Sequence, residues 1–210
     1  MRFAALAAAL ALTTLSPPRR AFGDSPTAPM VPGGSAAGTR AAPPSVEGVD
    51  YGESNAAKAR ALVDAAINMR DSDRAVKLLW QATDLDPTLG EAYMYLGLYY
   101  NSRSQFDRVV QVFQKEVKYE PKELNAYLNI GEAYMSYTPP KFDSALPYFR
   151  KGFEIDPTSS FAALRIGQIS AQQNNRADAV RFLKLASADR AKNPAIADEA
   201  DRLLRQMYGP

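Results

Sequence analysis

The chain has 210 residues, a formal charge of +2 at neutral pH and hydrophobic residues at 46% of its positions, and it contains neither Cys nor His. The lack of these two residue types excludes thiol nucleophiles, disulfides, histidine metal sites and histidine general bases. The near-balanced charge argues against a nucleic-acid partner, because nucleic-acid binders cluster Lys and Arg along the phosphate backbone.

Residues 1–23 are typical of a targeting segment. The uncharged apolar run Phe3–Leu15 has the length of the apolar region in a secretory signal and is too short for a stable membrane span. Small residues just before Asp24 predict cleavage there, although Arg19 and Arg20 also fit an organelle transit peptide. We therefore expect an exported protein, periplasmic or secreted, with import into an organelle lumen as the alternative.

The segment that follows has a different composition. Of the 35 residues from Ser16 to Asp50, 7 are Pro and 5 are Gly, and large apolar side chains are few. Such a composition does not bury enough apolar surface to offset the entropy cost of folding. We interpret residues 24–50 as a disordered linker that leads to a folded domain over residues 51–210.

The folded part contains a pattern that recurs in frames starting at Ala56, Gly90, Leu124 and Ser160. The second and third frames agree most closely, with a two-residue insertion in the third. Each has an aromatic residue at position 4, Leu or Ile before Gly at 7 and 8, Tyr at 11, Phe at 24 and Pro at 32. These residues are Tyr93, Leu96, Gly97, Tyr100, Phe113 and Pro121 in the second frame and Tyr127, Ile130, Gly131, Tyr134, Phe149 and Pro157 in the third.

This pattern resembles the tetratricopeptide repeat over about residues 54 to 191. The apolar residues recur at helical spacing, which supports helices independently. The resemblance implies an all-α fold, an α-solenoid of helix pairs in which stacked pairs share a core. The expected repeats are 56–89, 90–123, 124–159 and 160–193, followed by a capping helix over 194–207.

Three features refine this prediction. The repeat glycines should let two helices approach closely, and the closing prolines should end each pair. Pro147 lies inside a predicted second helix, where we expect an early-turn proline with a slight kink. Trp80 should cover the N-terminal end of the stack or pack against the incoming linker.

In the tetratricopeptide family, positions 2, 5, 6, 9, 12 and 13 of each repeat tend to line a concave groove that binds partner peptides. The resemblance therefore implies a peptide-binding groove with an apolar centre and polar groups at intervals. Its expected residues are Arg60, Asp64, Asn68, Met94, Tyr95, Leu98, Asn101, Asn125, Asn129, Glu132, Phe161, Arg165 and Gln168.

One subclass of the family binds a partner's C-terminal carboxylate through Lys, Asn and Arg from successive repeats. Asn129 and Arg165 match two of these positions, but Met94 and Leu98 stand where further clamp residues are needed. We therefore do not expect tail binding of that kind. For Arg165, the alternatives are a pair with an acidic ligand group and an ordinary solvated side chain.

The leading hypothesis is a non-enzymatic protein–protein interaction module, an adaptor or assembly factor of an envelope or lumenal complex. The alternative is a structural scaffold that forms a homo-oligomer through the solenoid ends. An enzyme is the remote alternative, because the sequence shows no Gly-rich phosphate loop, serine elbow or metal-ligand spacing. We expect no metal and no cofactor.

Overall fold

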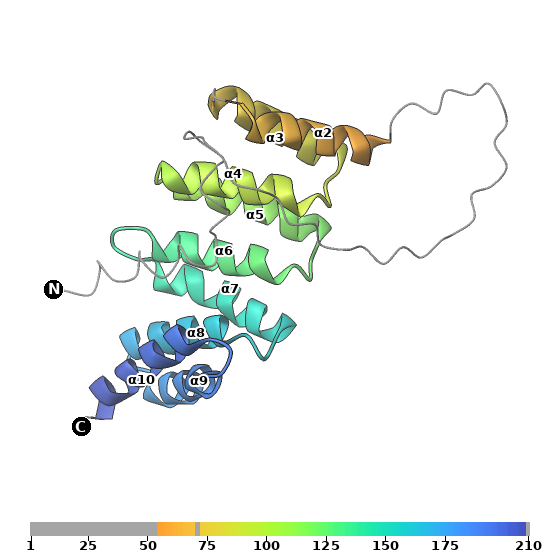
Figure 1. Cartoon of the computed structure of the whole chain (residues 1–210). Coiled ribbons are helices and arrows are strands. Elements are labelled where there is room, and N and C mark those ends of the chain that lie inside the picture. The colour runs from red at the N-terminus through yellow and green to blue at the C-terminus, as the bar shows by residue number, and fades with distance from the viewer. Residues whose placement is uncertain (1–53, 70–71, 209–210) are drawn as a thin grey trace, which may run out of the picture.

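The computed structural model describes residues 54–69 and 72–208, which form nine helices and no strand. This confirms the predicted all-α class and its helix pairs (Figure 1). The predicted targeting segment and linker, residues 1–23 and 24–50, lie outside the described residues. The helices are α2 (Asn55–Ile67), α3 (Ser72–Leu85), α4 (Gly90–Ser102), α5 (Phe106–Tyr119), α6 (Leu124–Met135), α7 (Phe142–Ile155), α8 (Ser160–Gln172), α9 (Arg176–Ala188) and α10 (Pro194–Tyr208).

The pairs α2/α3, α4/α5, α6/α7 and α8/α9 follow one another along a stack (Figure 1). Among the polar bonds between neighbouring pairs, several join one second helix to the next and one joins two first helices, beside bonds such as Trp80–Tyr100 from a second helix to the following first helix. The stack therefore has one layer of first helices and one of second helices. The bonds within the layers include Lys115–Asp84, Gln114–Tyr148 and Arg150–Asp178 in the second-helix layer and Arg165–Glu132 in the first.

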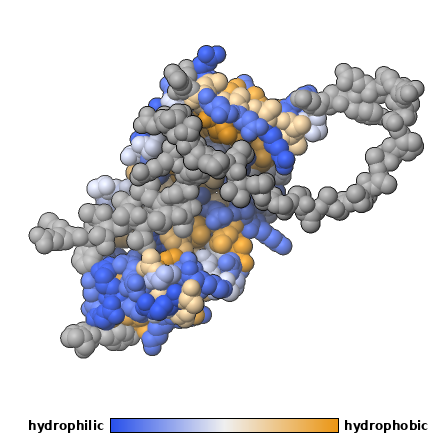
Figure 2. Space-filling model, viewed as in Figure 1, coloured by the Kyte–Doolittle hydropathy of each residue, from blue (hydrophilic) through white to orange (hydrophobic). Residues whose placement is uncertain are grey.

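Helix α10 covers the C-terminal end of the stack. Ala200 is buried in the C-terminal core, and the half-buried Ile196, Leu203 and Leu204 pack against it. The other side of the helix is polar, and hydrophilic residues predominate over the α8–α10 end in Figure 2. This confirms the predicted capping helix, since such a helix closes the core with one face and meets water with the other.

Within the second, third and fourth pairs, a side chain of the second helix lies directly on a glycine of the first. A Cβ atom at Gly131 would lie 2.6–2.8 Å from three ring atoms of Phe149, and one at Gly97 would lie 2.5 Å from Phe113. Leu183 takes the same place over Gly167, at 2.8 Å. The close approach predicted from the glycines is therefore real, because any larger residue would overlap the partner side chain.

The recurring turn between pairs is held by hydrogen bonds from both sides. The Asp86 carboxylate accepts from the backbone N–H and the hydroxyl of Thr88, at 3.0 and 2.7 Å, and Asp156 binds Thr158 in the same way. The Tyr93 hydroxyl donates to the carbonyl of Pro87 across the turn. The Asp-Pro-Thr turn thus fixes the next first helix as well as ending the previous second helix.

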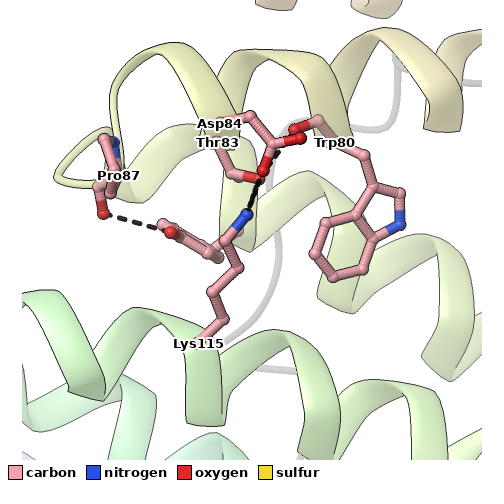
Figure 3. A network of polar contacts seen from close by, with 6 residues as sticks. Trp80, Thr83, Asp84, Pro87 and Lys115 are labelled. Carbon is pink, nitrogen blue, oxygen red and sulfur yellow. Dashed lines mark hydrogen bonds and ion pairs between the residues drawn. The ribbon is translucent and has the colours of Figure 1, made fainter.

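Trp80 joins the first two pairs rather than covering the end of the stack. Its indole N–H donates to the Tyr100 hydroxyl on α4 at 3.1 Å. Figure 3 shows Lys115 of α5 reaching Thr83 and Asp84 of α3, at 2.9 and 2.5 Å, beside the Trp80 ring, whose centroid is 5.3 Å from the ammonium. A cation between a carboxylate and an aromatic face stabilises this junction.

Helix α7 continues through Pro147, which lies in its second turn and is exposed. The missing N–H is the one that would bond to the carbonyl of Asp143. Because the proline faces solvent, water can reach that carbonyl and the ring displaces no core side chain.

Glu116 stands at position 27, where the repeat pattern has a small residue, and it is only 5% exposed. Its Oε1 lies 3.2 Å from the place a Cβ would take at Gly90, the first residue of α4. Burial, together with the nearby charges of Glu123 and Glu120, raises the pKa of Glu116 to about 8. An acid is therefore buried inside the second pair, against the first residue of α4.

Replacement of Gly131 by alanine tests the close approach. Alanine in a helix is ordinarily more favourable than glycine by about 1 kcal/mol. Here we expect Gly131→Ala to lower the free energy of unfolding by roughly 1–3 kcal/mol, because its methyl group overlaps the buried Phe149 ring. Denaturant titration followed by circular dichroism measures this. Adding Phe149→Leu should recover part of the loss, and an alanine variant more stable than the natural chain would contradict the packing.

Glu116→Gln tests the buried acid. A raised pKa means that the folded chain holds this proton more tightly than the unfolded chain, whose ordinary pKa is 4.5. As the pH rises from about 4.5 to 8, the natural chain should lose up to roughly 1.4 kcal/mol of stability per pH unit relative to Glu116→Gln.

Thermal unfolding at several pH values measures the difference between the two chains. Glu91→Gln removes an exposed acid from α4 and serves as the control. Parallel pH profiles for the natural chain and Glu116→Gln would show that Glu116 is ionised and solvated in the folded state.

Candidate functional site

The predicted groove residues lie on, or directly after, the first helices α2, α4, α6 and α8, and we call their shared surface the first-helix face. Arg60 and Asp64 on α2 are exposed, as is Asn68, the residue that follows this helix. The Asn68 amide donates to the backbone carbonyl of Asp64 at 2.8 Å, so it supports the end of that helix. The α2 part of the face therefore offers mainly one base and one acid to a ligand.

The centre of the face is half-buried and mainly apolar. Met94, Tyr95 and Leu98 of α4 are neither fully buried nor fully exposed, and Tyr95 packs against the N-terminal core. Burial raises the pKa of the Tyr95 hydroxyl, and the charges of Glu91 and Asp64 add to this effect. The centre thus offers an apolar surface with acids toward its α2 side.

Four side-chain amides of the predicted groove differ in whether their hydrogen-bonding groups are available to a ligand. Asn125 donates to the Glu123 carboxylate at 3.0 Å, and Gln168 accepts from Arg165 at 2.9 Å. In contrast, the half-buried side-chain amides of Asn101 and Asn129 make no hydrogen bond within residues 54–69 and 72–208. An amide has donors and an acceptor and can bind an extended peptide backbone. Asn101 and Asn129 are therefore the polar groups best placed for a ligand.

The two layers differ in charge. Helices α4, α6 and α8 carry one charged residue each, whereas α3, α5, α7 and α9 each carry four or five. The single charges are Glu91, Glu132 and Arg165. The first-helix face of the second, third and fourth pairs is therefore nearly free of charge.

Arg165 and Glu132 neutralise each other inside the protein. Arg165 Nη2 donates to Glu132 Oε2 at 2.7 Å, and Arg165 Nε lies 2.5 Å from Glu132 Oε1, at an angle too bent for a hydrogen bond. The two side chains are 2% and 9% exposed. Arg165 therefore neither faces solvent nor is open to an acidic ligand, which corrects both alternatives drawn from the sequence. The buried ion pair is the feature of the candidate site that sequence reasoning missed.

Burial raises the pKa of the Glu132 carboxyl, and the charge and hydrogen bond of Arg165 act in the opposite direction. A guanidinium does not lose its proton in proteins, so a neutral Glu132 would leave an uncompensated buried cation. The pair is therefore ionised at neutral pH.

The end of the face on α8 is closed. Phe161 is buried at 7% exposure, its ring 6.5 Å from that of Phe149 and 5.1 Å from the Arg165 guanidinium carbon. Phe161, Glu132 and Arg165 thus belong to the packed interior and do not line an open groove. The ligand contacts of the other predicted groove residues stay predictions.

Other kinds of site find no support among the described residues. No group of three or more carboxylates is arranged there to hold a metal ion. Glu91 is exposed, whereas Glu132 is buried and paired, so the two acids do not form a carboxylate pair. In the same part of the chain, every helix is too short or too polar to cross a bilayer.

No family model matches the chain. The chain is 28% identical over 119 residues to Superkiller complex protein 3 of Homo sapiens, covering 56% of this chain and 8% of that protein. It is 29% identical over 111 residues to tetratricopeptide repeat protein 37 of Xenopus laevis, covering 52% of this chain and 7% of that one. The chain thus spans only a small fraction of these curated relatives.

The fold is similar to that of solved structures. A crystal structure of MamA aligns with a TM-score of 0.55 at 23% identity, covering 65% of this chain and 80% of that chain. At this identity the match concerns the fold alone, and it agrees with the stacked helix pairs described above. Residue pattern, helix pairs and similar proteins together show that the chain is a tetratricopeptide-repeat protein.

Proposed function

We propose that this chain is a non-enzymatic adaptor or assembly factor that binds a peptide or protein segment on its first-helix face. The observation that carries the proposal is the contrast between the layers. The second helices use several of their charges for bonds between pairs, whereas the first helices of the second to fourth pairs present half-buried apolar side chains and two uncommitted amides. An apolar centre with a few hydrogen-bonding groups suits an extended segment.

The double variant Asn101→Ala/Asn129→Ala tests this face. It removes both uncommitted amides without touching a bond of the fold, so stability should stay within about 0.5 kcal/mol while partner binding falls. The full chain, crosslinked in the cells that make it, is isolated and its bound proteins are quantified. Loss of roughly 1 kcal/mol per hydrogen bond predicts about a tenfold or greater fall in binding.

Gln81→Ala is the matched control, because Gln81 is an exposed amide on the second helix α3. A partner that is retained by Gln81→Ala and lost by the double variant supports the first-helix face. Equal capture by both variants would rule this face out. A chain that captures only itself, and whose mass by light scattering rises with concentration, would favour the scaffold alternative.

We also propose export, on the strength of the apolar run Phe3–Leu15, with residues 24–50 as the linker to the repeats. In a bacterial host, the full chain with a C-terminal tag should be recovered from the periplasm and begin at Asp24 by mass spectrometry. Leu10→Arg/Leu12→Arg should abolish this processing, whereas Leu10→Ile/Leu12→Ile keeps the run apolar and should not. Recovery of the natural chain at full length and outside the periplasm would contradict export.

A further inference from the structure

The surroundings of Arg165 leave no open direction for a ligand. The Glu132 carboxylate occupies one side of the guanidinium, and the Gln168 amide oxygen accepts from Nη1 at 2.9 Å. The Phe161 ring lies 5.1 Å from the guanidinium carbon. An arginine in this position has its charge paired, two of its three nitrogens hydrogen-bonded and an aromatic ring beside its guanidinium.

An acidic ligand would have to displace Glu132 to reach Arg165. The displaced carboxylate is 9% exposed and would lose its cation without gaining water, which is strongly unfavourable for a buried charge. The gain from the new pair would be offset by the loss of the old one. An acid in a ligand therefore gains nothing at this place.

The pair lies next to the polar group best placed to bind a ligand. Asn129 and Glu132 are three residues apart on α6 and thus share a face of that helix. A segment whose backbone is bound by Asn129 would run past the internal ion pair. Its side chains there would meet a surface without net charge.

From this geometry we propose that Glu132 takes, within the chain, the place that a ligand carboxylate would take on Arg165. The first-helix face therefore binds an extended segment that has no acidic side chain and no C-terminal carboxylate against α6 and α8. This ligand class rests on the proposed function, whereas the role of Glu132 does not.

Chemical rescue tests the role of Glu132 without any partner. In the full chain, Glu132→Ala removes the carboxylate that pairs with Arg165 and should lower the midpoint of thermal unfolding. Sodium acetate should then raise the midpoint of this variant by on the order of 3 °C over sodium chloride at equal ionic strength. The natural chain and Glu132→Ala/Arg165→Met should respond equally to both salts.

Two results would overturn the assignment. An equal acetate response in the natural chain would mean that Arg165 is already open to anions. If Glu132→Ala folds but acetate does not raise its thermal midpoint, then the Glu132 carboxylate does not occupy an anion-binding position on Arg165.

Peptide selection on the natural chain tests the ligand class. A random peptide library is displayed and selected on the full chain, with Asn101→Ala/Asn129→Ala as the background. Peptides enriched over the background should be depleted in Asp and Glu, and Glu132→Gln, which keeps the side-chain volume, should admit acidic peptides. Acidic peptides enriched on the natural chain would overturn the ligand class. Absence of any enrichment would count against the proposed function itself, while the acetate experiment still decides the role of Glu132.

Discussion

The contact between a glycine on one helix and a side chain of the next helix is the constraint on which the rest of the stack depends. Gly97, Gly131 and Gly167 each accept a buried side chain where a methyl group would not fit. This contact brings the two helices of a pair close enough to share one core, and it fixes which faces remain outward. The Asp-Pro-Thr turns then connect the first pair to the second and the third pair to the fourth.

From this arrangement a division between the layers follows. The second helices carry most charges and link neighbouring pairs through exposed or partly exposed ion pairs such as Arg150–Asp178. The first helices of the second to fourth pairs carry one charge each, and two of the three charges cancel inside the protein. A surface that has little charge of its own discriminates ligands by shape, apolar contact and backbone hydrogen bonds rather than by electrostatic attraction.

Much of the fold could be predicted from the sequence, because the repeat pattern is a set of local signals that agree in register. Glycine, tyrosine and proline each stand where the packing requires them, as at Gly131 and its partner Phe149. The candidate site was harder to predict, because the position of a residue within its repeat does not show which side chain it contacts in the next repeat. Arg165 bonds to Glu132, 33 residues away, and only the structure shows that they meet. The signal was present, since two successive first helices hold a single charge each, of opposite sign.

The junction of the first and second pairs has a consequence for how the molecule can be observed. Trp80 is the one tryptophan among the 210 residues, and its indole bonds to Tyr100 and lies beside Lys115. Indole emission depends on the polarity around the ring, so the tryptophan emission of this protein reports on a single interface. Separation of the first pair from the stack would change that emission, whereas events confined to the third and fourth pairs would leave it unaltered. The natural chain thus carries a built-in optical probe of one contact between its repeats.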